Sequence, residues 1–384
     1  VFSRQPISFV RGSGSYLYTE DDTEYLDALT GIAVCGLGHA HPVIAQAIAE
    51  QAATLIHTSN IYEVNWQTAA AQKLAEVSGM EEIFFSNSGA ESNEGAIKIA
   101  RKFGHLQGVA SPKIIVADRS FHGRTMATLS ATGNKKVQEG FGPLVEGFIR
   151  VPFGDIEAIE EAAINHPDIV AILVEPIQGE GGVNTAPQGF SYLEEIRHIC
   201  NQHNWLMMLD EVQTGNGRTG KYFAYQHTNI IPDVMTTAKG LGNGFPIGAV
   251  MTQGRGVGVL TAGNHGSTYS GTHLGSRVVY TVLDLIQKEN IVENAAEIGT
   301  YLVDQFRVQL TDLNVIVRGF GMMIGIELPK DCGDLVNIAR DEHKLIINVT
   351  SGNVVRLLPA LNMTHEQADD LLQRLVPAIK NYLA

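Results

Sequence analysis

The chain has 384 residues, of which 44% are hydrophobic and 18% are charged. These values exclude a disordered chain and predict either one large α/β unit or two to three globular domains. There are 27 lysine and arginine residues against 41 aspartate and glutamate residues, and this net charge of −14 argues against a broad surface for nucleic acid or anionic membranes.

The cysteines and the first residues of the chain indicate the cellular compartment in which we expect the protein. Cys35, Cys200 and Cys332 are far apart and odd in number, so we expect neither a disulfide framework nor a zinc cluster. Residues 1–21 lack a basic start followed by an apolar core, and no apolar run approaches the roughly 20 residues of a membrane helix. The sequence therefore predicts a cytoplasmic protein.

Along the chain, the first predicted element is a hairpin with an acidic turn at residues 14–27. Further on, short apolar runs without clean alternation are interleaved with amphipathic stretches, as expected of strands that are covered on both faces. This order predicts an α/β fold with a mainly parallel sheet. The predicted strands are 83–85, 114–117, 169–174, 206–209 and 234–237, and the predicted helices are 91–103, 156–164 and 192–200.

The last third of the chain has a different pattern. Helical periodicity runs over 279–310, and the segments 315–318 and 323–327 are typical of paired strands. A final amphipathic helix is predicted at 364–383. From this pattern we predict a large domain at 46–279 and a smaller α+β domain that combines residues 1–45 with residues 280–384.

Polar residues follow each of the five predicted central strands, at the edge where open α/β sheets bind ligands. After the first strand, Ser86–Glu91 is a small polar turn that opens a helix, and free N–H groups at such a helix start favour a phosphate. After the second strand, Phe121 and Arg124 offer an aromatic face and a cation. The later strands are followed by Glu175 and Glu180, by Asp210 and Gln213, and by Lys239.

Lys239 and Asp210 carry the most specific chemical signal. Each ends or follows a buried-looking strand, and glycines after Lys239 give the lysine room. A lysine in a dry site can lose its proton and attack a carbonyl, and an aspartate in such a site can keep a pyridinium nitrogen charged. The pair predicts a pyridoxal phosphate enzyme.

Each of these residues alone has an ordinary structural explanation. Ser88 could cap a helix, Phe121 could belong to the core, and Lys239 could be solvated. His39 and His41 have no third metal ligand nearby, so we expect a turn with satisfied histidines and no metal.

Two glycine-rich segments could be mistaken for nucleotide sites. Gly215–Tyr222 nearly matches the nucleotide P-loop, which would make the chain an ATPase, but Tyr222 cannot hold magnesium as the required Ser or Thr does. Gly240–Gly244 lacks the full dinucleotide fingerprint. We therefore interpret both segments as turns.

Nearly end to end, the chain resembles the class III (subgroup II) pyridoxal-phosphate-dependent aminotransferases of fold type I. The resemblance rests on long motifs that occur in order: Asn87–Glu94, Ser120–Thr125, Glu175–Gly182, Leu209–Gly215, Thr237–Gly240, Asn264–Thr268 and Val354–Pro359.

This resemblance implies roles in cofactor binding. Lys239 is expected to bond covalently to the aldehyde of pyridoxal 5'-phosphate, and Asp210 is expected to pair with the ring nitrogen. Phe121 is expected to stack on the ring and Gln213 to lie near the ring hydroxyl. Thr268 is expected to reach the phosphate in the other subunit, which implies a homodimer with shared sites. The remaining expected cofactor contacts are Ser88, Gly89, Ala90, Glu211 and Val212.

The resemblance also implies substrate contacts. Arg124 and Ser267 are expected to touch substrate, and Arg356 to clamp the α-carboxylate of 2-oxoglutarate or glutamate. Glu180 is expected to neutralise Arg356 while the other substrate is bound. The implied reaction moves the terminal amino group of N-acetylornithine to 2-oxoglutarate. Succinylornithine, N-succinyl-diaminopimelate, ornithine, 4-aminobutyrate or other ω-amino donors, an aminomutase and a non-catalytic binding protein remain as alternatives.

Three places depart from the usual pattern of the family. Residue 216 is Asn where an aliphatic residue is common, and Ser270–Ser276 replaces a Gly-Gly-Asn-Pro-Leu-Ala stretch. The loop Tyr62–Trp66 also differs. We expect all three near the active-site rim and the dimer interface, where they would affect substrate range and leave the cofactor chemistry unchanged.

Overall fold

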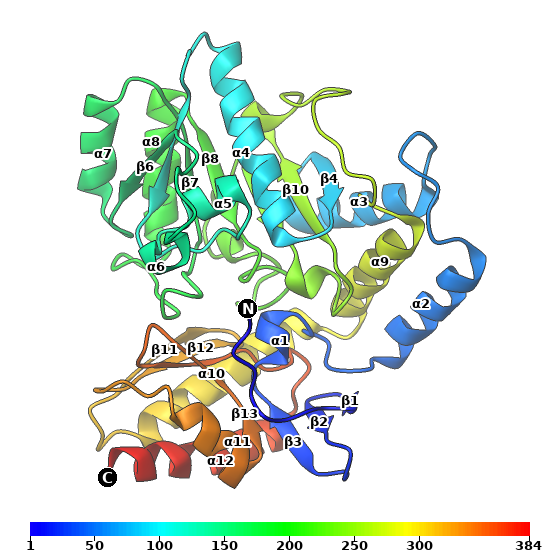
Figure 1. Ribbon diagram of the computed structural model, residues 1–384, viewed down its shortest axis with the longest axis vertical. Helices are drawn as coiled ribbons and strands as arrows, with labels where there is room; N and C mark the ends of the chain where they lie inside the picture. The colour runs from blue at the N-terminus through cyan, green and yellow to red at the C-terminus, as the bar shows by residue number, and fades with distance from the viewer.

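The computed structural model describes residues 1–384 and has a sheet-centred upper part above a lower part that contains both ends of the chain (Figure 1). The central sheet has seven strands in the order β4-β10-β9-β8-β7-β5-β6. Only β10 is antiparallel to its neighbours, so the α/β fold with a mainly parallel sheet is confirmed. The strands are β4 (Glu82–Ser86), β5 (Lys113–Ala117), β6 (Phe148–Val151), β7 (Ile169–Val174), β8 (Leu206–Asp210), β9 (Val234–Thr237) and β10 (Gly248–Thr252).

Two of these strands are absent from the sequence-based prediction. β6 is an edge strand whose first three residues are only partly buried, including Arg150, so it lacks the apolar run that identified the others. β10 is fully buried but follows a glycine-rich turn, and it lies between β4 and β9. The position of β10 depends on pairing with strands that are distant in sequence.

Helices cover both faces of the sheet. Apolar residues of α4 (Gly89–Leu106) pack against one face, where Ile114, Leu173 and Met208 project. Alternate strand residues such as Ile115 and Met207 face the other side and pack against a second group of helices. The burial of both faces explains why these strands read as continuous apolar runs. The helices on the second face are α3 (Asn65–Ser78), α7 (Ile156–Asn165), α8 (Ser191–His203) and α9 (His273–Lys288).

The helical stretch predicted at 279–310 is two helices. α9 ends at Lys288 and α10 (Ile291–Gln309) begins after Asn290, which adopts a left-handed φ of 51°. Asparagine tolerates this conformation better than most residues, so the chain can turn there. The remaining helices are α1 (Thr30–Ala33), α2 (Pro42–Thr54), α5 (Met126–Ala131), α6 (Lys135–Gln138), α11 (Leu335–His343) and α12 (His365–Leu383).

The lower part joins the two ends of the chain. The predicted N-terminal hairpin is a three-stranded meander of β1 (Arg11–Ser13), β2 (Tyr16–Tyr18) and β3 (Glu24–Asp27). β3 then pairs in parallel with β13 (Leu345–Ile346). A second sheet has the order β11-β12-β15-β14 and contains β11 (Ile316–Phe320), β12 (Met323–Glu327), β14 (Asn348–Thr350) and β15 (Val354–Leu357).

The domain division remains a proposal. We propose to keep the large domain at 46–279 and the small domain at 1–45 and 280–384. One hydrophobic core supports this division, because it combines Leu26, Leu37 and Ile44 with side chains such as Phe306 and Leu371, apart from the two cores that flank the central sheet.

Two further predictions concern single segments. Gly215–Tyr222 forms a turn and opens no α-helix, and the guanidinium of Arg218 within it donates to the carbonyl of Met322 at 3.1 Å and to that of Pro359. The Arg218 side chain therefore links this turn to the segments that contain Met322 and Pro359. Among the helices of the structure, none combines the length and the apolar character that crossing a bilayer requires.

Candidate active site

A pocket of about 410 Å³ opens at the carboxyl edge of the central sheet. Residues that follow β4, β5, β7, β8 and β9 line it, together with Val34 near the N-terminus and Phe245–Ile247 before β10. The sequence-predicted residues among the lining are Ser88, Gly89, Ala90, Phe121, Arg124, Glu180, Asp210, Val212, Gln213 and Lys239. Folding therefore brings together side chains from all five predicted strand ends.

The start of α4 forms one wall of this pocket. Ser88 is its N-cap in an extended conformation, and the hydroxyl accepts a hydrogen bond from the N–H of Glu91 at 3.2 Å. A Cβ on Gly89 would lie 2.7 Å from Cγ1 of Val212, so only glycine allows the helix to approach the segment after β8 this closely. Unpaired N–H groups in the first turn of α4 make this wall suited to a phosphate.

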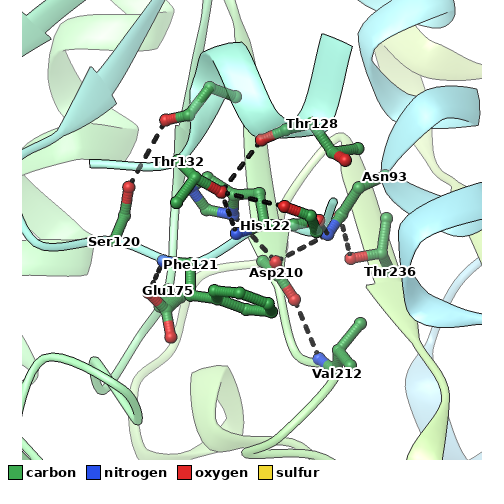
Figure 2. A network of polar contacts seen from close by, with 12 residues as sticks. Asn93, Ser120, Phe121, His122, Thr128, Thr132, Glu175, Asp210, Val212 and Thr236 are labelled. Carbon is green, nitrogen blue, oxygen red and sulfur yellow. Dashed lines mark hydrogen bonds and ion pairs between the residues drawn. The ribbon is translucent and has the colours of Figure 1, made fainter. Parts of the chain in front are cut away.

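Asp210 lies at the centre of a buried hydrogen-bond network (Figure 2). Its Oδ2 accepts from Nδ2 of Asn93 at 2.7 Å and from Nδ1 of His122 at 2.8 Å. Its Oδ1 accepts from the N–H of Val212 at 3.0 Å and keeps one acceptor position free. Thr236 donates to Oδ1 of Asn93 at 2.8 Å and so fixes the orientation of that amide. The network fixes the position of the carboxylate at the pocket wall.

Neither Asn93 nor His122 was assigned a site role from the sequence. The Nδ1 of His122 carries the proton in this arrangement, because it donates to a carboxylate, while its buried Nε2 has no hydrogen-bond partner. His122 directly follows Phe121 in the sequence, and this position next to a predicted site residue could have identified it as a candidate site residue.

Glu175 joins the ends of two strands next to this network. One carboxylate oxygen accepts from the N–H of Phe121 at 2.9 Å and the other from the N–H of Gly179 at 3.1 Å. Burial raises the pKa of Glu175 to about 7, and the neighbouring Asp210 also raises it. The contact with Phe121 N–H fixes the backbone that carries the aromatic ring, over which the guanidinium of Arg124 lies 5.5 Å from the centroid.

Lys239 enters the pocket from the turn after β9. Burial lowers the pKa of its amine to about 8, and the positive charge of Arg356 lowers it further. The lysine has a left-handed φ of 45°, an uncommon conformation for a residue with a side chain. Near neutral pH a larger fraction of this amine is unprotonated than for an ordinary lysine, so it suits a nucleophile and a proton carrier.

Arg356 lies behind the pocket on β15 and is almost fully buried. Its Nη1 is 2.8 Å from Oε1 of Glu180 and 3.4 Å from Oε1 of Gln213. Asn348, its cross-strand partner on β14, accepts from Nε at 3.1 Å and from Nη2 at 2.7 Å through Oδ1. Asn348 was not identified from the sequence, and it fixes one edge of the guanidinium while Glu180 occupies the other.

Four of the predicted site residues lie outside the pocket lining. Besides Arg356, these include Ser267, which accepts from Nδ2 of the lining residue Asn87 at 2.9 Å, and Thr268, which is exposed. The carboxylate of Glu211 points away and accepts from the N–H groups of Ala224 at 2.9 Å and Tyr225 at 2.8 Å. This geometry gives Glu211 a structural task in the turn after β8, and its expected cofactor contact stays a prediction.

The structure also places the three segments that depart from the family pattern. Loop 57–67 packs against 269–273, since Asn60 Nδ2 donates to the carbonyl of Ser270 at 2.8 Å and His57 and Tyr269 have ring centroids 5.6 Å apart. Asn216 departs from the expectation of a rim position, because it is buried beside the strand end that leads to Lys239.

The pocket fits pyridoxal phosphate on three grounds. Asp210 presents a fixed carboxylate with a free acceptor position, Lys239 presents an amine with a lowered pKa, and Gly89 leaves space at a helix start that suits a phosphate. Phe121 adds an aromatic face between these groups in the lining. Residues suited to hold each part of such a cofactor thus line one cavity.

Comparisons with known proteins agree with this chemistry. The chain is 52% identical over 384 residues to an acetylornithine aminotransferase of Nitrosomonas europaea, covering 100% of this chain and 97% of the relative. A solved acetylornithine aminotransferase of Elizabethkingia anophelis superposes with a TM-score of 0.89 at 34% identity, covering 99% of this chain and 95% of that one. An ornithine aminotransferase of Toxoplasma gondii, solved with pyridoxal phosphate at partial occupancy in its active site, gives a TM-score of 0.93 at 32% identity, covering 98% and 90%.

A family model described as aminotransferase class-III matches residues 3–379. The chain therefore belongs to the class-III aminotransferases and uses pyridoxal phosphate as its cofactor.

Proposed function

We propose that this enzyme transfers the terminal amino group of N2-acetyl-L-ornithine to 2-oxoglutarate, giving N-acetyl-L-glutamate 5-semialdehyde and L-glutamate, a step of arginine biosynthesis. The observation that carries the proposal is the full-length similarity to acetylornithine aminotransferases, at 52% identity to the relative from Nitrosomonas europaea. The Arg356–Glu180 pair beside the pocket supports it, because a guanidinium with a partly exposed partner can serve a dicarboxylate and also a donor without a carboxylate at that place.

The cofactor supplies an electron-withdrawing ring, which weakens a C–H bond at the carbon that carries the reacting amino group. Asp210 would pair with the ring nitrogen, because its carboxylate is fixed beside the pocket by Asn93, His122 and the N–H of Val212. Phe121 would lie against one face of the ring, and the first turn of α4 would hold the phosphate.

Lys239 moves the proton in this scheme. Its amine, with a pKa lowered to about 8, would accept the proton that leaves the amino-bearing carbon of the substrate and would carry it to the cofactor. The amino group stays on the enzyme between the two half-reactions, so the kinetics should be ping-pong.

Arg356 and Glu180 provide the dual specificity. In the present geometry, Glu180 neutralises Arg356 at 2.8 Å, which suits a donor without a carboxylate at that place. The Glu180 side chain is 38% exposed, so it can move away and leave the guanidinium free for the carboxylate of 2-oxoglutarate or glutamate. Arg124, exposed at the rim, and Asn87 with Ser267 are then available to the distal part of either substrate.

We also propose a homodimer in the cytoplasm. Apolar side chains are exposed where loop 55–62 meets the segment beside Thr268, with Ile61 at 84%, Tyr62 at 67% and Tyr269 at 65% exposure. Such a patch is typical of a protein interface and supports a second subunit placed so that Thr268 reaches the neighbouring site. The three free cysteines agree with a reducing compartment.

A substrate panel tests the proposed reaction. Purified holoenzyme is mixed with N-acetylornithine, N-succinylornithine, ornithine or 4-aminobutyrate, and single turnovers are followed by the cofactor absorbance. We expect the highest kcat/KM with N-acetylornithine. A clear preference for unacylated ornithine or for 4-aminobutyrate would overturn the assignment while leaving the aminotransferase family intact.

A further inference from the structure

Asn216 lies in the turn after β8 and is only 2% exposed. Its Nδ2 donates to Oγ1 of Thr237 at 2.9 Å and to the carbonyl oxygen of Ala238 at 3.2 Å. Thr237 is the last residue of β9, and Ala238 directly precedes Lys239. One side chain therefore holds both residues that lead into the lysine.

Further contacts hold the backbone on either side of Lys239. The hydroxyl of Ser92, on α4, donates to the carbonyl oxygen of Thr237 at 3.2 Å. After the lysine, a Cβ on Gly240 would lie 3.2 Å from Cβ of Asn216, so the asparagine packs against the chain on both sides of Lys239. The left-handed φ of 45° at Lys239 persists only if its surroundings hold it in place.

Packing alone does not account for an asparagine at this position. The buried Oδ1 of Asn216 has no hydrogen-bond partner, and an unpaired buried amide oxygen is destabilising. An aliphatic side chain would fill the same space without an unpaired oxygen, but the left-handed φ of 57° at this position favours asparagine or glycine over such a side chain. The two hydrogen bonds from Nδ2 are what an aliphatic residue could not supply.

We propose that Asn216 is a positioning residue that fixes the backbone before Lys239 and so aims the lysine amine into the pocket. Asn216 does not line the pocket, and its effect passes through Thr237 and Ala238. The inference rests on the proposed function only in that Lys239 is the reacting amine, and it does not depend on which amino donor is used.

Two substitutions test this role. Asn216→Gly removes the amide and tolerates the left-handed φ of 57°, whereas Asn216→Leu keeps the bulk but strains the backbone. In both variants we expect kcat to fall about tenfold with KM within about twofold, since a displaced amine slows proton transfer without removing substrate contacts.

A second readout is independent of turnover. The visible absorption band of the holoenzyme should titrate with a midpoint displaced by at least about half a pH unit, because the pKa of the lysine-bound form depends on where Lys239 is held. A kcat and a titration midpoint that both stay at wild-type values in Asn216→Gly would overturn the inference, whether or not Asn216→Leu folds.

Matched variants separate positioning from backbone strain. Asn204→Gly changes another left-handed asparagine, φ 56°, at the exposed end of α8, and it should leave both readouts unchanged. Thr237→Val removes one acceptor, so its effect on kcat should be less than additive with that of Asn216→Gly.

Reductive trapping distinguishes the two possible failures. Borohydride reduction and peptide mass mapping should place the cofactor on Lys239 in the wild type and in each variant. Absence of label there in the wild type would defeat the proposed function. Label at Lys239 together with unchanged kcat and midpoint in Asn216→Gly would defeat only the positioning role.

Discussion

At the scale of single residues, the buried side chains of Asp210 and Arg356 differ in how their hydrogen-bond partners hold them. Asp210 is held by three hydrogen-bond donors of the protein itself. Arg356 is held on one edge by Asn348 and on the other by Glu180, which is partly exposed. The carboxylate of Asp210 is thus held on both oxygens, whereas the partner of Arg356 is partly exposed, which supports the proposed exchange of Glu180 for a substrate carboxylate.

Replacing Asp210 with Asn should slow proton removal by about 10²- to 10⁴-fold, because a neutral amide no longer stabilises the protonated ring nitrogen. Cofactor content should change much less, since the phosphate wall at α4 is untouched. Stopped-flow absorbance of the amine half-reaction measures the effect. Asp284→Asn, which alters a carboxylate paired with Lys73 and Lys288 outside the pocket, serves as control and should keep the wild-type rate.

Replacing Arg356 with Ala should damage the keto-acid half-reaction most. We expect a loss of about 10²-fold or more with 2-oxoglutarate, because removing one partner of a buried ion pair costs about 3–5 kcal/mol, and a much smaller loss with the amine donor. Single-turnover rates of the two half-reactions measure this, with Arg101→Ala, a half-buried arginine outside the pocket lining, as control. Equal losses in both halves would contradict the exchange of Glu180 for substrate.

Two elements depend on contacts that are specific to one residue type. At the end of β3, Oδ1 of Asp27 accepts from the N–H groups of Leu29 and Thr30, both at 2.9 Å, while Oδ2 is 2.7 Å from Nε2 of His39. At the start of α4, Gly89 allows the close approach to Val212. The first contact links the N-terminal sheet to the chain that follows it, and the second shapes the pocket.

The His39–Asp27 pair should make stability depend on pH. The hydrogen bond to Asp27 raises the pKa of His39 to about 9 from the ordinary 6.5. Because the folded state binds the proton more tightly, the contribution is full below about pH 6.5 and is lost as the pH rises through about 9. His39→Gln should therefore cost about 1–3 kcal/mol at pH 6 and much less at pH 9.5.

Thermal unfolding of the holoenzyme at these two pH values measures the effect. His365→Gln, which removes an exposed pair with Glu297, is the control and should change stability little at either pH. A difference between wild type and His39→Gln that is the same at pH 6 and pH 9.5 would refute the linkage.

Gly89→Ala should weaken cofactor binding. The added Cβ would meet Cγ1 of Val212 at 2.7 Å, so either α4 or the segment after β8 must move, and both line the pocket. We expect the dissociation constant for pyridoxal phosphate to rise about tenfold or more, consistent with the 1–3 kcal/mol of an overpacked contact, as measured by fluorescence titration of the apoenzyme. Gly333→Ala, where a Cβ meets nothing within 4 Å, should bind as the wild type does.

At the scale of the whole molecule, the proposed dimer predicts that two inactive variants regain activity when they form a mixed dimer. A Lys239→Ala chain and a Thr268→Val chain should each have low activity, the first through loss of the reacting amine and the second through a weakened phosphate site. In the mixed dimer, the intact Lys239 of one chain would meet the intact Thr268 of the other. One wild-type site per mixed dimer should therefore restore up to half of the activity.

Refolding the two variants together and purifying the doubly tagged species gives this measurement, with each variant refolded alone as control. Sedimentation should give about twice the 41.5 kDa mass of the chain. Activity of the mixed species no higher than that of its parents would argue against shared sites.

The sequence by itself determined the strands β4, β5, β7, β8 and β9 and the residues that follow them, because a strand buried on both faces needs a local apolar run and a polar end. It also determined the pairing of a strand-end aspartate with a strand-end lysine in one pocket, since parallel strands end at the same edge.

Only the tertiary structure decided which side chains support that pair. Asn93 donates a hydrogen bond to Asp210, which is 117 positions away in the sequence. Asn348 on β14 contacts Arg356 on the neighbouring strand β15. Asn216 lies beneath the turn of Lys239 instead of at the rim, and β10 inserts between β4 and β9. Local patterns report how deeply a residue is buried, whereas a hydrogen-bond partner is set by distances of about 3 Å that exist only once distant segments have packed.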